Sequence, residues 1–192
     1  MKKEVVTAIL LLALGAPGTV AIANAQAKSD QKPTFGGTFD RSAKGMEQEI
    51  VPAAEAMPED KFNYAPTQGE FKGVRTFAQQ VKHIAATNYM FAAGILGEKP
   101  PVELGGENGP DSMTSKADIV KFLKDSFTYL HKALDSMNES TALAEIASPF
   151  GSNKTTRLRL AIIAVSHPWD HYGQMVEYLR ANGIVPPASR AQ

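Results

Sequence analysis

The chain has 192 residues, with 20 basic and 20 acidic side chains and four histidines. This balanced charge gives no sign of a nucleic-acid partner. The sequence contains no cysteine, which excludes disulfides, a lipoprotein anchor, thiolate metal ligands and a cysteine nucleophile. Any metal site must therefore be built from His, Asp, Glu and water.

The N-terminal residues have the pattern of a secretory signal peptide. Lys2 and Lys3 precede a short apolar run at 5–14, and Ala23-Asn24-Ala25 fits a small-residue cleavage site. The apolar run is well short of the roughly 20 residues that a membrane-spanning helix needs. We predict a signal peptide over 1–25, with cleavage after Ala27 as the alternative. The mature protein is expected in the periplasm or outside the cell, with no membrane association after cleavage.

The mature chain is expected to form one domain. Residues 26–37 are mostly small and polar, which predicts a flexible tether. The domain is predicted over 38–192, and its length of about 155 residues suffices for a single hydrophobic core. Apolar residues at helical spacing predict a first helix over 39–57, in which Pro52 causes a kink or an early end. A long loop is predicted over 57–69.

Three further helices follow. The second is predicted over 74–96, ending at Gly97, and a Gly- and Pro-rich loop over 98–114 separates it from the third. Ser115 is a predicted N-cap, and the third helix extends to about residue 137. The fourth starts near residue 154 or 155 and ends at Asn182-Gly183. No segment of length alternates as a strand would, so the sequence predicts an all-α antiparallel four-helix bundle.

Three of the four histidines form a candidate metal site. His167 and His171 are four residues apart, so on one helix their rings lie on the same face, about one turn apart. His83, in the second helix, is the natural third ligand. His131 has no partner at ligand spacing and is interpreted as a surface or boundary histidine.

Two neighbours of the histidine pair bear on the site. Pro168 lies inside the fourth helix and predicts either a kink or a fresh helix that begins there, with Trp169 packed inward to anchor the distortion. Asp170 could be a fourth ligand, a proton acceptor, or the carboxylate that orients a ligating ring. Gln174, one turn further, could have a similar polar role.

Three imidazoles suit zinc or nickel best, with iron, manganese and copper as alternatives, and they leave room on the ion for water or substrate. Water bound at such an ion can have its pKa lowered to about 7. The competing interpretation is that the histidines are incidental, since His pairs at this spacing also arise by chance. His83 lies off the main apolar stripe, in line with Thr76, Gln80 and Thr87, which form either a solvated face or the polar lining of a cleft.

Two stretches of the chain resemble the DinB family of four-helix metal-binding proteins. One runs from Glu55 to Thr67 and continues from Phe71 through His83 to Tyr89, and the other runs from His167-Pro-Trp-Asp-His171 to Ser189. The resemblance implies an up-down-down-up four-helix bundle, a divalent metal held by His83, His167 and His171, and frequently a homodimer. Tyr172, where many relatives have Arg, and Pro168 depart from the family pattern.

The sequence therefore predicts an exported DinB-like metalloprotein with an open three-histidine site. The expected activity is that of a metal-dependent hydrolase or transferase acting on an unidentified small molecule. The alternative is a helical bundle that binds a metal or a small ligand without turnover.

Overall fold

The computed structural model describes residues 32–190. The predicted signal peptide, 1–25, and the first part of the predicted tether, 26–31, lie outside the described residues. Within the described part, no helix combines the length and the apolar character needed to cross a membrane.

The first helix, α2 (Phe35–Ala56), begins earlier than the sequence predicts. The hydroxyl oxygen of Thr34 accepts a hydrogen bond from the backbone N–H of Gly37 at 3.0 Å and caps the helix. The rings of Phe35 and Phe39 pack 5.5 Å apart. Residues 35–37 of the predicted tether are therefore helical. Pro52 lies inside α2 and does not end it.

The second helix, α3 (Phe77–Leu96), starts at a capping box. Thr76 accepts from the N–H of Gln79 at 3.2 Å, and the Gln79 side chain accepts from the N–H of Thr76 at 2.8 Å. This reciprocal cap places the start three residues after the predicted Val74. The helix ends at Gly97, whose φ of 75° is left-handed, as predicted. A short 3₁₀ helix, η1 (Glu59–Lys61), lies in the predicted loop between α2 and α3.

The remaining elements include a hairpin that the sequence does not predict. Helix α4 (Lys116–Asp135) is capped by Ser115, and α5 (Glu139–Ala142) follows. Strands β1 (Glu145–Ala147) and β2 (Lys154–Thr156) pair antiparallel, and three residues each are too few to show an alternating pattern. Helix α6 (Arg157–Ala181) and the 3₁₀ helix η2 (Pro187–Ser189) complete the fold.

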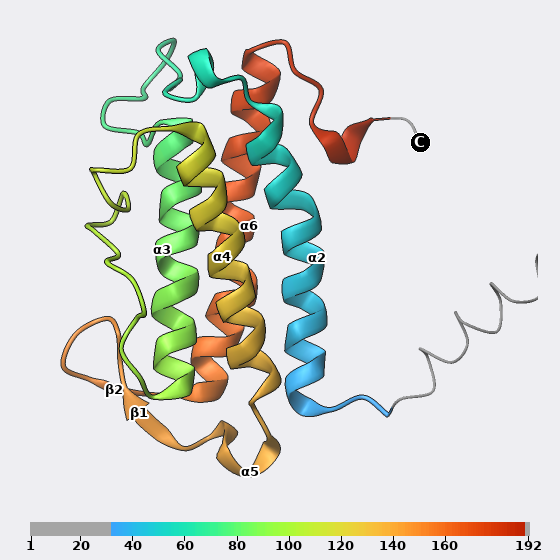
Figure 1. Ribbon diagram of the computed structural model, residues 1–192, viewed down its shortest axis with the longest axis vertical. Coiled ribbons are helices and arrows are strands. Elements are labelled where there is room, and N and C mark those ends of the chain that lie inside the picture. Colours follow the sequence, from blue (N-terminus) through green and yellow to red (C-terminus); the bar gives the residue numbers. More distant parts are fainter. Residues whose placement is uncertain (1–31, 191–192) are drawn as a thin grey trace, which may run out of the picture. The chain divides into compact units, whose positions relative to one another are not determined.

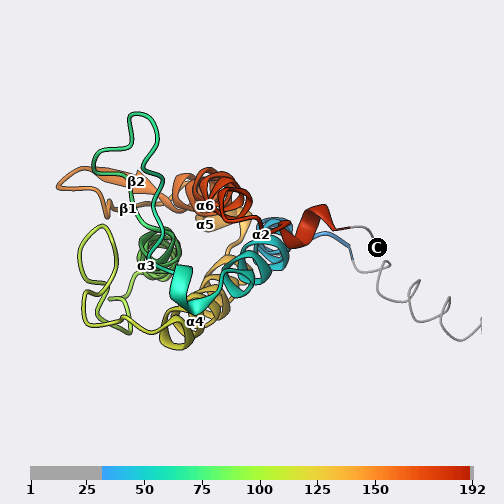
Figure 2. The same ribbon diagram turned by 90° about the horizontal axis from the view of Figure 1, so that it is seen from above.

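The four long helices form a bundle in which α2 and α3 each pack against both α4 and α6. In Figure 1, α2 and α6 run upward and α3 and α4 run downward, so the predicted all-α, up-down-down-up architecture is confirmed. Figure 2 shows the four helices from above, and one cluster of buried side chains forms their common core. The largest fully buried side chains are Met46, Ile50, Met57, Phe77, Ile84, Phe91, Ile95, Ile119, Leu123, Phe127, Leu130 and Leu134.

This topology determines where the long connection between α3 and α4 lies. Because α3 and α4 run in the same direction, residues 97–115 must return along the bundle before α4 can start (Figure 1). The connection therefore passes beside the first half of α3, where His83 is located.

Candidate metal centre

The adjacent helices α3 and α6 bring the three predicted histidines together. The Nε2 atom of His167 lies 3.3 Å from Nε2 of His83 and 3.1 Å from Nε2 of His171. Each ring offers a ligand atom within 4.8 Å of the others, so this group could hold a metal ion. Two nitrogens bound at 2.0–2.1 Å to one tetrahedral ion lie about 3.3–3.4 Å apart. The observed separations fit that geometry.

Oxygen acceptors determine which nitrogen of two of the rings is protonated. The Nδ1 atom of His83 contacts the backbone carbonyl oxygen of Glu107, and Nδ1 of His171 lies 2.7 Å from Oε1 of Gln80. Because an oxygen acceptor requires a proton on the nitrogen, both rings carry hydrogen on Nδ1. Their Nε2 atoms therefore present lone pairs, the form in which imidazole binds a metal.

A carboxylate anchors the Gln80 contact. The amide nitrogen of Gln80 donates to Oε1 of Gln174 at 2.7 Å, and the amide nitrogen of Gln174 donates to Oδ2 of Asp170 at 3.3 Å. A carboxylate only accepts, so it determines the orientation of both amides and leaves Oε1 of Gln80 facing His171. Asp170 is thus connected to the histidine cluster through Gln174 and Gln80.

Burial keeps the three imidazoles neutral. It lowers the pKa of His83 and of His167, and for His167 the neighbouring His83 adds to the effect. Burial, followed by the other two rings, lowers the pKa of His171 to about 3. Neutral imidazoles at neutral pH are the form that a metal ligand requires.

Hydrogen bonds among the three imidazoles cannot account for both short Nε2 contacts, whereas a bound cation could. The buried Nδ1 of His167 has no hydrogen-bond partner among residues 32–190, so only this ring could carry its proton on Nε2. One proton can serve at most one of the two short Nε2 contacts. A metal ion between the rings would satisfy all three lone pairs.

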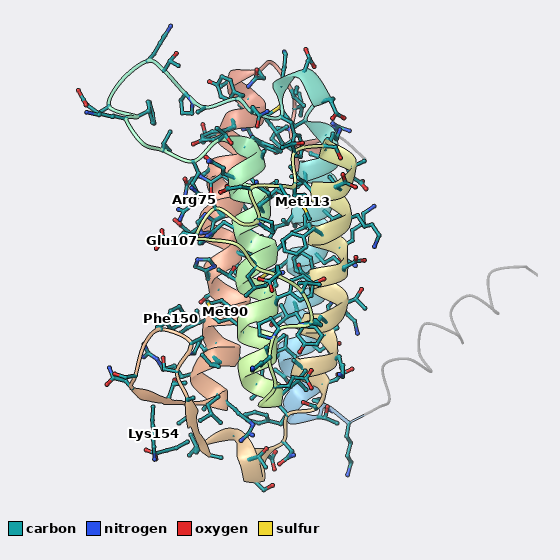
Figure 3. All side chains as sticks on the ribbon, turned by 60° about the vertical axis from the view of Figure 1, so that its left-hand side comes forward. Arg75, Met90, Glu107, Met113, Phe150 and Lys154 are labelled. Carbon is teal, nitrogen blue, oxygen red and sulfur yellow. The ribbon has the colours of Figure 1, made fainter. Side chains whose placement is uncertain are left out.

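A cavity of about 490 Å³ adjoins the cluster, and His83 and His167 form part of its wall. Arg75 also borders it. The Nε atom of Arg75 donates to Oδ1 of Asn108 at 2.9 Å, and its Nη2 lies 3.4 Å from a carboxylate oxygen of Glu107. Figure 3 shows Arg75 and Glu107 close together, with Met90 and Phe150 further down the same side of the bundle.

Lys82 holds the 97–115 connection in place. Its buried ammonium group donates to the carbonyl oxygens of Pro110 at 2.8 Å and Met113 at 3.3 Å. A Cβ atom at Gly109 would lie 2.5 Å from Cβ of Lys82, so the backbone approaches α3 more closely there than a side chain would allow. These contacts position the carbonyl of Glu107 beside His83.

Other residues singled out from the sequence lie outside the cluster. His131 ties α4 to α2, with Nδ1 2.6 Å from a carboxylate oxygen of Asp40 and Nε2 3.1 Å from one of Glu47. The predicted inward packing of Trp169 is wrong, because this side chain is 41% exposed and stacks edge-on with Tyr172. The buried Pro168 lies within a continuous α6, so no fresh helix begins there.

Tyr172 links α6 to α2. Its hydroxyl donates to a carboxylate oxygen of Glu49 at 3.0 Å. Burial and this hydrogen bond raise the pKa of Tyr172 to about 12. The side chain is therefore a neutral donor at physiological pH.

Sequence reasoning missed several residues of the site. Gln80 was noted only as part of a polar series, although its position three residues before His83, on the same face of the helix, is a usable signal. Arg75 and Lys82 do not belong to any sequence motif that would mark them as residues of the site. The Glu107 contact uses a backbone carbonyl, for which no side-chain pattern exists.

Comparison with known proteins agrees with this architecture. The crystal structure of a DinB-like protein from Bacillus subtilis matches with a TM-score of 0.58 and 22% identity, over 81% of this chain and 99% of the other. A DinB-like protein from Bacillus cereus matches with a TM-score of 0.49 and 19% identity, over 75% of this chain and 95% of the other. No curated protein has a significantly similar sequence.

The likeness to the Bacillus subtilis structure shows the fold. A family model adds a match at the level of sequence. The model of the DinB superfamily matches residues 43–175, which include His83, His167 and His171. The chain therefore belongs to the DinB superfamily.

Proposed function

We propose that the protein binds one divalent transition metal through His83, His167 and His171. The observation that carries this proposal is the convergence of three Nε2 atoms, two of them with lone pairs exposed by oxygen acceptors at Nδ1. An all-nitrogen set suits zinc or nickel best, with iron, manganese and copper as alternatives.

We further propose a metal-dependent hydrolase or transferase activity on a small molecule. Three protein ligands leave coordination room, and a metal in such a site supplies an acidified water or a polarised substrate oxygen. The chain's own part is to hold the three rings neutral and oriented. The cavity bordered by His83 and His167 gives a substrate access to the same point.

A specific observation favours the alternative, a metal- or ligand-binding protein without turnover. The described side chains that line the cavity include only four titratable groups, namely the two histidines, Arg75 and Glu107. The Glu107 side chain is 89% exposed and faces Arg75, so it is poorly placed as a general base. Assays of the loaded protein against esters, amides, phosphoesters and thiol conjugates separate the two functions.

Elemental analysis of protein purified from its own host tests the metal site. We expect about one transition metal per folded chain, and loss of loading when His83, His167 or His171 is replaced by Ala, because each replacement removes one of three ligands. The matched control is His131→Gln, which changes the fourth histidine and should retain the metal. Full occupancy in the triple His→Ala variant would refute the site.

We also propose that the protein is exported and forms a homodimer. The pattern over residues 1–25 supports export, and N-terminal sequencing of the mature protein should find a start after Ala25 or Ala27. Exposed apolar side chains on α6, Ile162 and Trp169, support self-association. Light scattering of Trp169→Lys against the wild type measures the oligomeric state.

A further inference from the structure

The cavity beside the histidine cluster has a polar end and an apolar end. Along α3 its wall runs from His83 to Met90, seven residues and roughly 10 Å further. Because α6 runs antiparallel to α3, Ile163 lies one turn from His167 in the same direction. The histidines therefore lie at one end of the cavity wall, and the other end is lined by apolar side chains.

The apolar end is built from four segments of the chain. Its side chains are Met90, Phe91, Leu104, Phe150 and Ile163. The ring of Phe150, in the hairpin loop, packs 5.7 Å from the ring of Phe91 and is still 58% exposed. An apolar ligand that covered these side chains would remove them from water, which is favourable in proportion to the area covered.

At the polar end, the guanidinium of Arg75 has hydrogen-bond donors that are not all used. Two of its N–H groups are used, by Asn108 and by the exposed carboxylate of Glu107. The other N–H groups have no partner among the described residues. An exposed ion pair of this kind is weak, so an incoming anion can replace Glu107 at little cost. The hydroxyl of Tyr178 donates to the Arg75 carbonyl at 3.0 Å and fixes its backbone.

We propose that the cavity binds a small amphipathic carboxylate, with its head group between the metal centre and Arg75 and its hydrocarbon tail along Met90, Phe91 and Phe150. The position of the head group rests on the proposed metal site. Arg75 selects for a single negative charge, and the length of the apolar wall selects for a tail that spans about two helical turns.

Calorimetric titration with straight-chain carboxylates tests this inference on the zinc-loaded protein. Acetate has the head group without the tail and should bind only weakly. From butanoate to octanoate, affinity should rise about fourfold per methylene, the factor that corresponds to burying one CH₂. Affinity that does not depend on chain length would overturn the proposal, and so would octanol binding as tightly as octanoate.

Matched variants locate the ligand. Phe150→Ala should weaken octanoate binding about five- to tenfold, whereas Phe71→Ala, another exposed loop phenylalanine that lies outside this cavity, should not change it. Arg75→Gln should weaken it about tenfold by removing a charged donor. Equal effects of Phe150→Ala and Phe71→Ala would contradict the assigned position.

Glu107→Gln should change octanoate affinity in the opposite direction, towards tighter binding. The variant keeps the backbone carbonyl that contacts His83 and removes the carboxylate that competes for Arg75. Octanoate affinity should rise about 1.5- to fivefold, the range of an exposed ion pair. Weaker binding by this variant would count against a head group at Arg75.

The same titration on chelator-treated protein separates this inference from the metal proposal. If zinc binds but affinity does not change from butanoate to octanoate, the proposed ligand class is wrong and the proposed metal site stands. If zinc does not bind but the series and the Phe150→Ala effect persist, the metal proposal fails and the apolar end of the cavity is confirmed as a ligand site.

Discussion

Gln80 determines which nitrogen of His171 is free to bind a metal. It is buried to 1% exposure and accepts from Nδ1 of His171 while its own amide donates to Gln174. The oxygen of Gln80 faces His171 because the amide nitrogen of Gln80 donates to Gln174. The amide nitrogen of Gln174 in turn donates to Asp170. A buried amide with both ends satisfied orients a ligand ring at no cost in unpaired polar groups.

Replacing Gln80 by Met should weaken metal binding about 10- to 100-fold, the usual effect of losing a group that orients a ligating histidine. Methionine has a similar length but neither accepts from Nδ1 strongly nor donates to Gln174. Competition with a chromophoric chelator measures the dissociation constant. Gln48→Met, an exposed change on α2, is the control. Equal affinities of the two variants would show that the Gln80 contact is not needed.

The sequence predicted the cluster of three histidines better than its surroundings, for a physical reason. His167 and His171 are related by helical periodicity, which is visible along the chain. His83 and Gln80 become neighbours of this pair only when α3 and α6 pack. The Glu107 carbonyl comes next to His83 only when the long connection returns along the bundle. Asp170 lies beside His171 in sequence but is connected to its ring through two amides, an arrangement that spacing alone cannot reveal.

At the scale of elements, caps explain where the helices begin. The apolar periodicity predicted all four long helices, but Thr34, Thr76 and Ser115 determine the starts of α2, α3 and α4. Thr34 was missed because the polar, Gly-rich segment around it resembles a tether. The β1–β2 hairpin was missed because its strands have three residues each and no buried position, which is too little to show an alternating pattern.

The buried carboxylate of Asp40 joins α2 to α4 through a network of charged side chains. Its carboxylate oxygens lie 2.5 Å from Nζ of Lys44 and 2.6 Å from Nδ1 of His131. Burial alone would raise the pKa of Asp40, but the hydrogen bonds from Lys44 and His131 outweigh it and hold the pKa below the ordinary value. The ionised form is therefore favoured in the folded protein, and the network contributes to stability while Asp40 is charged.

Asp40→Asn should lower the free energy of unfolding by about 1–3 kcal/mol at pH 7, the cost of disturbing the charged hydrogen bonds of a buried carboxylate. Because the folded-state pKa is lowered, this contribution is complete above the unfolded-state pKa of about 3.9 and is lost as the pH falls towards the folded-state value. The difference between variant and wild type in urea unfolding should therefore shrink below about pH 4.

The control for this measurement is Asp125→Asn. Asp125 also pairs with a lysine one helical turn away, Lys121 at 2.5 Å, but both side chains are at least half exposed. Its effect should stay within about 0.5 kcal/mol at every pH, as for other exposed pairs on a helix. If Asp40→Asn were no more destabilising than Asp125→Asn, the network would have no role in holding α2 against α4.

At the scale of the whole molecule, the candidate site joins three parts of the bundle that are far apart in the sequence. His83 comes from α3, His167 and His171 come from α6, and the 97–115 connection contacts His83 through Glu107 and α3 through Lys82. Helices α3 and α6 are adjacent sides of the bundle. An ion shared by them would bind the folded protein far more tightly than the unfolded chain, in which His83 and the His167–His171 pair are separated.

Metal binding should therefore raise the melting temperature. At a free zinc concentration of 100 times the dissociation constant, the stabilisation is about 2.7 kcal/mol, which corresponds to about 5–11 °C for a domain of this size. Thermal unfolding followed by circular dichroism, with and without zinc, measures the shift, and a chelator should reverse it. The triple His83, His167 and His171→Ala variant should melt at the same temperature in both conditions. A shift of equal size in that variant would mean that zinc stabilises the fold elsewhere, and the bundle would then have no need of a metal between α3 and α6.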